Sequence, residues 1–202
     1  MPKKSRLNAR KQPRQARSQE TVAVILEAAA RVLEESGLEG YNTNAVATRG
    51  GISVGSIYQY FPNKDALTLA LIARFDDELL DKVRTAIAGA EASSLRQSLK
   101  LLIRALIDVH AGRANLNRIL ETEEDRLRPS TPSATASQLK KMVAALLANH
   151  RAEFGNPVDA ATIDDLIVIV RAMVDAALQE DIPQRSAEAR VLRAVEGYLH
   201  WR

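Results

Sequence analysis

The chain has 202 residues, of which 46% are hydrophobic, 26% are charged and only 4% are aromatic. This composition is typical of a globular protein, and its many unbranched alanine and leucine side chains favour helices over strands. The chain contains no cysteine, which excludes disulfides, thiolate zinc sites and a cysteine nucleophile. Because it lacks the apolar run of a secretory signal and any segment of membrane-spanning length, we expect a cytoplasmic protein with no membrane partner.

The positive charge is concentrated at the front of the chain. Residues 1–64 hold ten Lys/Arg against five Asp/Glu, whereas the remainder is mildly acidic. Residues 1–17 alone carry seven basic side chains, the last of them Arg17, and no acid. Such an arm is either a solvated tail or a flexible segment that neutralises DNA phosphates or enters a minor groove. A DNA-binding motif directly downstream favours the second interpretation.

The first predicted helix begins at Ser18, which can cap it, and ends near Gly37. Apolar residues between Val22 and Leu33 recur at i, i+3 and i+4 spacing, which places them on one helical face. We expect this helix to be the first of a small three-helix unit.

Residues 42–64, NTNAVATRGGISVGSIYQYFPNK, predict two short helices around a glycine break. Asn42 or Thr43 can cap the first of them, and the glycines at 50 and 51 can adopt the positive φ of a sharp helix end. Ser53 can cap the second, whose buried face should contain Ile57 and Phe61. Two short helices joined by a tight glycine-containing turn form a helix-turn-helix, which sets its second helix in a major groove of DNA.

The polar residues of the second short helix suit contact with DNA. Gly55 would let the helix approach the duplex closely, and hydroxyl and amide groups can bond base edges or phosphates. After Pro62, Asn63 can cap the next helix, so that Lys64 lies at a helix N-terminus, where free N–H groups and the ammonium group can hold a phosphate. The side chains expected to point outward are Ser56, Tyr58, Gln59 and Tyr60.

The stretch GISVGSIYQYFPNKDAL closely resembles the DNA-binding domain of TetR-family transcriptional regulators, and YNTNAVATRGG resembles the preceding helix of that family. The resemblance covers roughly residues 17–70. Gly50 stands where the family usually has alanine, which we expect to loosen the first short helix without changing the fold. The resemblance implies phosphate contacts from Thr43, Ser53, Tyr58, Tyr60 and Lys64, and base contacts from Asn44, Gly55, Ser56 and Gln59.

A competing motif overlaps this stretch, because residues 51–55 also fit G-x-S-x-G, the nucleophile elbow of α/β-hydrolases. That elbow needs a strand before the serine, and an acid and a histidine downstream. A helical pattern precedes Ser53 instead, and His110, His150 and His200 have no convincing acid partner in the sequence. We therefore expect no enzyme, and keep a serine hydrolase at Ser53 as the less favoured alternative.

Helical patterns continue over residues 65–88, 95–110, 116–127, 138–153, 159–179 and 187–201, with a Pro/Ser/Thr-rich loop at 129–135 and a break at 155–157. The family resemblance implies that the last two helices pair with those of a second copy and that the middle helices enclose an effector pocket. Histidine spacing predicts no metal site, no glycine loop for phosphates is present, and no cofactor is expected. Candidate polar groups of the pocket are His110, Arg113, Asn117, Glu121, Arg171 and Asp175.

The sequence thus predicts an all-α protein with a basic arm (1–17), a helix-turn-helix domain (18–64) and an effector-binding and dimerisation domain (65–202). The predicted function is a homodimeric transcriptional repressor that a small-molecule effector releases from a double-stranded operator. The effector would favour a state in which the reading helices are wrongly spaced, with the helix at 65–88 as the lever. The alternative is a helical small-molecule-binding or scaffold protein that does not read DNA.

Overall fold

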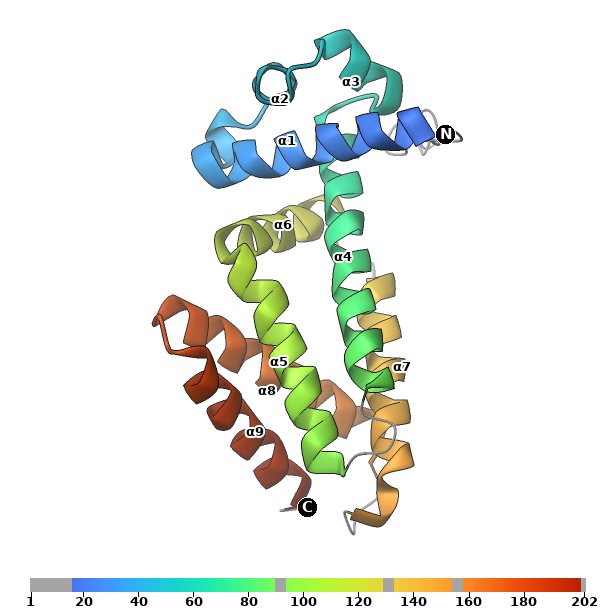
Figure 1. Cartoon of the computed structure of the whole chain (residues 1–202), viewed down its shortest axis with the longest axis vertical. Coiled ribbons are helices and arrows are strands. Elements are labelled where there is room, and N and C mark those ends of the chain that lie inside the picture. Colours follow the sequence, from blue (N-terminus) through green and yellow to red (C-terminus); the bar gives the residue numbers. More distant parts are fainter. Residues whose placement is uncertain (1–15, 90–93, 129–132, 154–157, 201–202) are drawn as a thin grey trace. The chain divides into compact units, whose positions relative to one another are not determined.

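The structure, a computed structural model, describes residues 16–89, 94–128, 133–153 and 158–200, without the side chains of Ala16, Arg17 and His200. Every regular element in these ranges is a helix, which confirms the predicted all-α class (Figure 1). Residues 1–15 of the predicted basic arm (1–17), residues 129–132 of the predicted loop, the break at 155–157 and Trp201 lie outside the described residues. The elements are α1 (Ala16–Gly40), α2 (Thr43–Gly50), α3 (Val54–Tyr60), α4 (Lys64–Ala88), α5 (Leu95–Gly112), α6 (Ala114–Leu127), α7 (Ala134–Asn149), the 3-10 turn η1 (Arg151–Glu153), α8 (Ala160–Gln179) and α9 (Gln184–His200).

The described residues form two compact units. The first contains α1, α2, α3, the part of α4 up to Phe75, and α6 from Asn115; the second contains the rest of α4 with α5, α7, α8 and α9. The division is therefore one of packing and falls within α4. The functional boundary predicted after Lys64 is a separate matter and stays a prediction.

The first unit is built on the apolar stripe of α1. Ile25 and Leu33 are completely buried and share a core with apolar side chains of α2, α3, α4 and α6. Because α1 begins at Ala16, Ser18 lies inside the helix and the predicted cap there is wrong. Gly37, where the helix was expected to end, has φ 61° and ψ −165°, so it interrupts the helical conformation before the final turn to Gly40.

In the second unit α5 packs against α8 and α9, which also pack against each other, and α7 packs against α8. Val83, Leu147 and Val191 are completely buried in their common core. Two helices begin earlier than predicted, α7 at Ala134 and α9 at Gln184. For α7 the reason is local: the Ser133 side chain accepts the Ala136 N–H and caps the helix inside what the composition indicated to be a loop. Within the described ranges, no helix combines the length and apolarity needed to cross a membrane.

Candidate nucleic-acid interface

The turn between α2 and α3 has the geometry that its glycines predict. Asn42 caps α2, since its side chain accepts the Ala45 N–H at 2.9 Å. Gly51 ends the helix in the left-handed conformation, at φ 63° and ψ 32°, and its N–H reaches the Thr48 carbonyl at 3.3 Å. A residue with a side chain rarely adopts this conformation, so the predicted role of glycine in the sharp helix end is confirmed at Gly51.

Gly50 has a different role, which concerns the distance between helices. It is the last helical residue of α2, and a Cβ atom built on it would lie 3.2 Å from the Cβ of Ala28 on α1. Contacts that short are rare between real Cβ atoms. The missing side chain therefore lets α2 pack closely on α1, which gives a structural reason for glycine at this position.

Ser53 caps α3, as predicted. Its Oγ accepts the Ser56 N–H at 3.0 Å and lies 2.8 Å from the Ser56 Oγ. Ile57 and Phe61 are buried, but so is Tyr60, at 9% exposure. The expectation that Tyr60 points outward is wrong, because residues 57, 60 and 61 have the i, i+3, i+4 spacing that shares one face of a helix. This burial weighs against a DNA contact from Tyr60.

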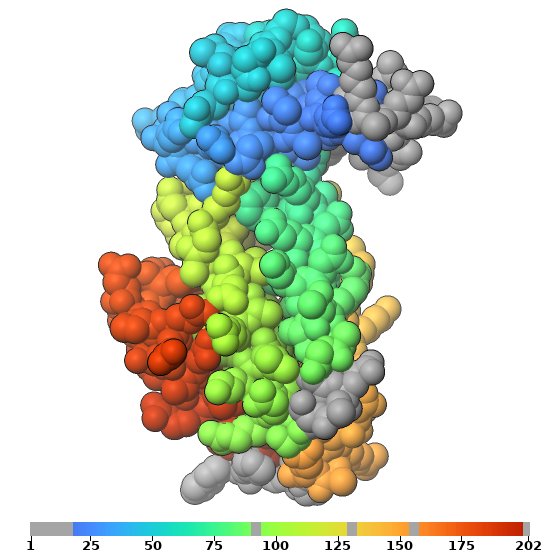
Figure 2. Space-filling view, viewed as in Figure 1, coloured from blue at the N-terminus to red at the C-terminus, as the bar shows by residue number. Residues whose placement is uncertain are grey.

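The other polar residues predicted on α2 and α3 share an accessible surface of the first unit. The hydroxyls of Thr43 and Tyr58 lie 3.3 Å apart, so the first residue of α2 is hydrogen-bonded to α3 across the turn. Figure 2 shows this part of the chain in cyan at the surface of the unit. We call this surface the α2–α3 face; its exposed or half-buried residues are Thr43, Asn44, Ser53, Gly55, Ser56, Tyr58 and Gln59.

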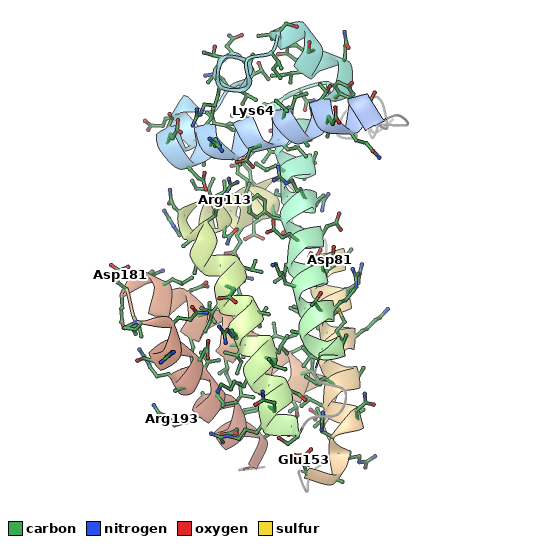
Figure 3. The ribbon with its side chains drawn as sticks, viewed as in Figure 1. Lys64, Asp81, Arg113, Glu153, Asp181 and Arg193 are labelled. Carbon is green, nitrogen blue, oxygen red and sulfur yellow. The ribbon has the colours of Figure 1, made fainter. Side chains whose placement is uncertain are left out.

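Lys64 is the first residue of α4, where Figure 3 labels it. Asn63 caps this helix by accepting the Ala66 N–H at 2.8 Å, as predicted. The Lys64 ammonium nitrogen lies 5.5 Å from the centroid of the Tyr41 ring, which is the arrangement of a cation–π contact. Sequence reasoning missed Tyr41, although an aromatic residue directly before the Asn42 cap was a possible signal.

The Tyr41 hydroxyl is held inside the first unit, 3.2 Å from the Thr68 Oγ1. Burial raises the pKa of Tyr41 to about 12; the Thr68 hydrogen bond opposes this shift, while the charges of Glu123 and Asp65 add to it. Burial disfavours a charged phenolate, so Tyr41 is a neutral aromatic ring across the physiological pH range.

Helix α6 contributes an ionic cluster to the same unit. Arg126 Nη2 lies 2.9 Å from Asp65 Oδ1 and 2.7 Å from Glu123 Oε2. The side chain of Glu123 is only 6% exposed, so its charge requires a partner. Glu123 first, and Asp65 next, raise the pKa of Arg126. The cluster attaches α6 to the first turn of α4, directly after Lys64.

The six candidates for an effector pocket are divided between the units. Asn117 and Glu121 belong to the first unit, and the other four to the second. Asn117 carries a buried amide nitrogen with no hydrogen-bond partner, which is uncommon in a folded protein. His110 is half-buried, and its Nδ1 lies 2.7 Å from the Leu106 carbonyl of its own helix. A single pocket formed by these residues stays a prediction.

His150 has an acid partner, contrary to expectation. Its Nδ1 lies 2.9 Å from Glu153 Oε1, and its Nε2 lies 3.2 Å from the Ser98 hydroxyl. The spacing resembles a Ser-His-Glu relay, but Ser98 is 1% exposed and also bonds the Ser94 carbonyl. Glu153 accepts the Leu95 N–H with both oxygens at 3.0 Å, and this bond is the main reason that the pKa of Glu153 is lowered. The cluster therefore caps α5, and its serine is closed to a substrate.

The hydrolase alternative fails at Ser53 for a separate reason. The residue follows α2 and a turn, and no strand occurs among the described residues, so the strand–turn–helix elbow is not formed. Its hydroxyl caps α3 instead. The described residues also contain no group of three or more His, Asp or Glu side chains that could hold a metal ion.

Part of the first unit matches a known family of proteins. Residues 25–71 match the family model described as bacterial regulatory proteins, tetR family. The match contains most of α1, all of α2 and α3, and the start of α4. It therefore includes the whole α2–α3 face together with Tyr41 and Lys64.

Three curated relatives align with parts of the chain. The fatty acid metabolism regulator protein of Bacillus subtilis is 26% identical over 99 residues, or 49% of this chain and 50% of the relative. The transcriptional repressor KstR of Mycobacterium tuberculosis is 36% identical over 67 residues, or 33% and 30%. The nucleoid occlusion factor SlmA of Sodalis glossinidius is 31% identical over 110 residues, or 52% and 54%. The chain thus spans about half, or less, of the length of these relatives.

Solved structures extend the similarity of fold to most of the chain. The fatty acid degradation regulator FadR of Bacillus halodurans superposes with a TM-score of 0.69 at 17% identity, covering 92% of this chain and 96% of that one. A TetR transcription regulator from Haloarcula marismortui has a TM-score of 0.70 at 19% identity, with coverages of 90% and 97%. At such identities the comparison establishes the fold.

Proposed function

We propose that this chain, a member of the tetR family of bacterial regulatory proteins, is a homodimeric transcriptional repressor that a small-molecule effector releases from its DNA operator. The observation that carries the proposal is the α2–α3 face. Its polar side chains are accessible. The caps at Asn42 and Ser53 fix where its two helices begin, and the Thr43–Tyr58 hydrogen bond joins one helix to the other. A repressor would act in the cytoplasm, where bacterial DNA lies.

In the proposed complex α3 lies in the major groove, with Gln59 and Ser56 directed to base edges. Gln59 is exposed, and its amide can bond adenine through two atoms. Gly55, exposed at the start of α3, allows the helix backbone to come close to the duplex. The hydroxyl groups of Thr43 and Tyr58 and the ammonium group of Lys64 are donors for DNA phosphates. Such phosphate contacts would fix the position of the protein along the duplex.

Control by an effector is supported by α6. This helix carries the unpartnered amide of Asn117 and, further along, Arg126 with its contacts to Asp65 and Glu123. An effector that binds beside Asn117 and prefers a different position of α6 would alter the first turn of α4. Such an effector weakens DNA binding by the difference between its affinities for the two states.

Dimerisation is supported by the apolar surface of α8. Val168 is 65% exposed, and Ala172, which lies one helical turn further along the same side of α8, is also exposed. A helix face of this kind gains stability when a second copy covers it. Two helix-turn-helix units that a dimer holds at a fixed distance also suit a two-fold symmetric operator. We propose that the homodimer interface is formed by the last two helices, α8 and α9.

The proposal is tested by titrating a fluorescent duplex, taken from directly upstream of the gene, with the full chain. We expect binding that is tighter than to a shuffled duplex of equal composition and that weakens steeply with salt. Gln59→Ala should reduce the preference between duplexes. Lys64→Gln should weaken binding to both duplexes and lower the salt slope by about 0.9 for each phosphate that the variant no longer neutralises. Equal affinity for the two duplexes would contradict specific DNA reading.

The effector is tested on the same complex. Because two of the similar proteins are named for fatty acid metabolism or degradation, fatty acids are the first compounds to add. Release by one of them in the wild type, but not in Asn117→Leu, would support a site at α6. Release that is unchanged in Asn117→Leu would move the site elsewhere.

A further inference from the structure

Tyr41 is a buried aromatic residue that lies outside the predicted set of DNA contacts. The Lys64 ammonium nitrogen lies 5.5 Å from the centroid of its ring. We infer that Tyr41 is a positioning residue for DNA binding, which holds the Lys64 ammonium group where it can meet a DNA phosphate. The inference rests on the proposed function and deepens it, since it names what orients one of the phosphate contacts.

The ring is well placed to be a fixed support. Tyr41 is 2% exposed and stands between the end of α1 and the cap of α2. Its hydroxyl lies 3.2 Å from the Oγ1 of Thr68, a completely buried residue. The same Thr68 hydroxyl donates to the Lys64 carbonyl at 3.0 Å. Thr68 therefore contacts both the Tyr41 hydroxyl and the Lys64 backbone. These two contacts keep the Tyr41 ring and Lys64 in a fixed relative position.

The attraction leaves the ammonium group available for DNA. The negative face of an aromatic ring attracts a cation that lies within about 6 Å of its centroid. An ammonium group carries three N–H donors, so donors remain for phosphate oxygens when one side of the group faces the ring. A free lysine side chain loses much rotamer freedom when it binds, and a side chain that is already ordered loses less.

The surrounding charges are consistent with this role. Asp65, the next residue in sequence, pairs with Arg126 at 2.9 Å, and the buried Glu123 pairs with the same guanidinium group. The Tyr41 ring is a neutral aromatic face at physiological pH, because a phenol ionises only well above pH 7 and burial raises the pKa of Tyr41 further. Asp65 and Glu123 are both paired with Arg126, and Lys64 contributes its positive charge at the start of α4.

The test compares Tyr41→Phe, Tyr41→Leu, Lys64→Gln and the Leu/Gln double variant, each as a full chain, on the upstream duplex. Tyr41→Phe keeps the aromatic face and should bind within about two-fold of the wild type. Tyr41→Leu should bind about two- to five-fold more weakly per half-site, and by the square of that factor for a dimer that uses both. In the Lys64→Gln background, Tyr41→Leu should have no further effect, because its role is exercised through the lysine.

A second measurement does not depend on DNA and distinguishes a missing cation–π contact from a disrupted fold. The ε-methylene protons of Lys64 should show an upfield ring-current shift by NMR in the wild type and in Tyr41→Phe, and lose it in Tyr41→Leu. An unshifted wild-type signal overturns the inference. So does a Tyr41→Leu effect of equal size with and without Lys64, which would mark Tyr41 as a purely structural residue.

The outcomes also separate this inference from the proposed function. If the wild type binds the upstream duplex and Tyr41→Leu, folded by circular dichroism, binds equally well, the inference fails and the function stands. If the wild type itself does not bind the duplex specifically, the proposed function fails, and the role of Tyr41 in DNA binding fails with it.

Discussion

The hydroxyl groups of Thr43 and Tyr58 lie 3.3 Å apart, which joins the first residue of α2 to the exposed side of α3. Two residues implied as separate phosphate contacts are therefore coupled before DNA binds. Each hydroxyl can serve as donor in this bond, and the coupled pair can present one donor to a phosphate while it restrains the angle between the two helices.

Tyr58→Phe removes one hydroxyl of that pair without emptying the core, because Tyr58 is 42% exposed. Loss of one net hydrogen bond corresponds to roughly 0.5–1.5 kcal/mol, so affinity for the operator should fall by about two- to ten-fold. The unfolding free energy should change by less than about 0.5 kcal/mol. Fluorescence anisotropy and urea titration measure the two quantities. Thr43→Val is the matched variant. The double variant should lose less affinity than the two single losses multiplied together. Losses that multiply fully would show that the two hydroxyls act independently.

Gly51→Ala tests the turn between the helices. At φ 63° an alanine is strained although nothing lies within 4 Å of its Cβ, so we expect a loss of about 1 kcal/mol or more in unfolding free energy. Gly51→Asn should lose less, since asparagine tolerates this conformation better. Gly55→Ala is the control: its Cβ would meet the Ser53 Oγ only at an ordinary 3.7 Å. Stability is measured by thermal unfolding. Equal losses of stability in Gly51→Ala and Gly55→Ala would show that alanine is not strained in the left-handed turn.

The lowered pKa of Glu153 predicts a pH dependence for the second unit. A carboxyl group whose pKa is lower in the folded state contributes stability above its unfolded-state pKa, and this contribution is lost as pH falls through the folded-state value. The wild type should therefore lose stability on acidification below about pH 5 more steeply than Glu153→Gln. Thermal unfolding between neutral and acid pH measures the difference. Glu39→Gln, at an exposed position of α1, is the control, and identical pH profiles for wild type and Glu153→Gln would contradict the capping role.

Val168→Glu tests the proposed dimer interface. Since Val168 is 65% exposed within one chain, the substitution should leave the folded chain stable. A carboxylate placed in an apolar interface has no partner there, so the dimer should dissociate. Light scattering should give about twice the chain mass of 22.1 kDa for the wild type and the single-chain mass for the variant. Ala148→Glu, at an exposed position of α7, should remain dimeric; a dimeric Val168→Glu would exclude this face.

The local features of the predicted helix-turn-helix could be derived from the sequence because they depend on a few neighbouring residues. The caps at Asn42, Ser53 and Asn63 each bond a backbone N–H three residues ahead. The orientation of Tyr60 was mispredicted because its hydroxyl was treated as an outward-pointing polar group, although Tyr60 follows the buried Ile57 by three residues and shares its face of α3.

Contacts between distant parts of the chain could not be predicted in the same way. Arg126 reaches Asp65 across 61 residues, and Glu153 caps α5 from 58 residues away. Charged residues are common on helix surfaces, so no spacing rule indicates which of them will meet. A local pair was missed as well: His150 and Glu153 are three residues apart, where α7 gives way to the 3-10 turn η1.

The central claim, that this chain reads a DNA operator as a dimer, is tested most directly by footprinting the full chain on its own upstream region. We predict one protected segment containing two half-sites related by two-fold symmetry, with less preference for that segment in Gln59→Ala and weaker protection overall in Lys64→Gln. Uniform protection that appears only at low salt, with no preferred segment, would contradict the claim and leave a helical protein with a non-specific affinity for nucleic acid.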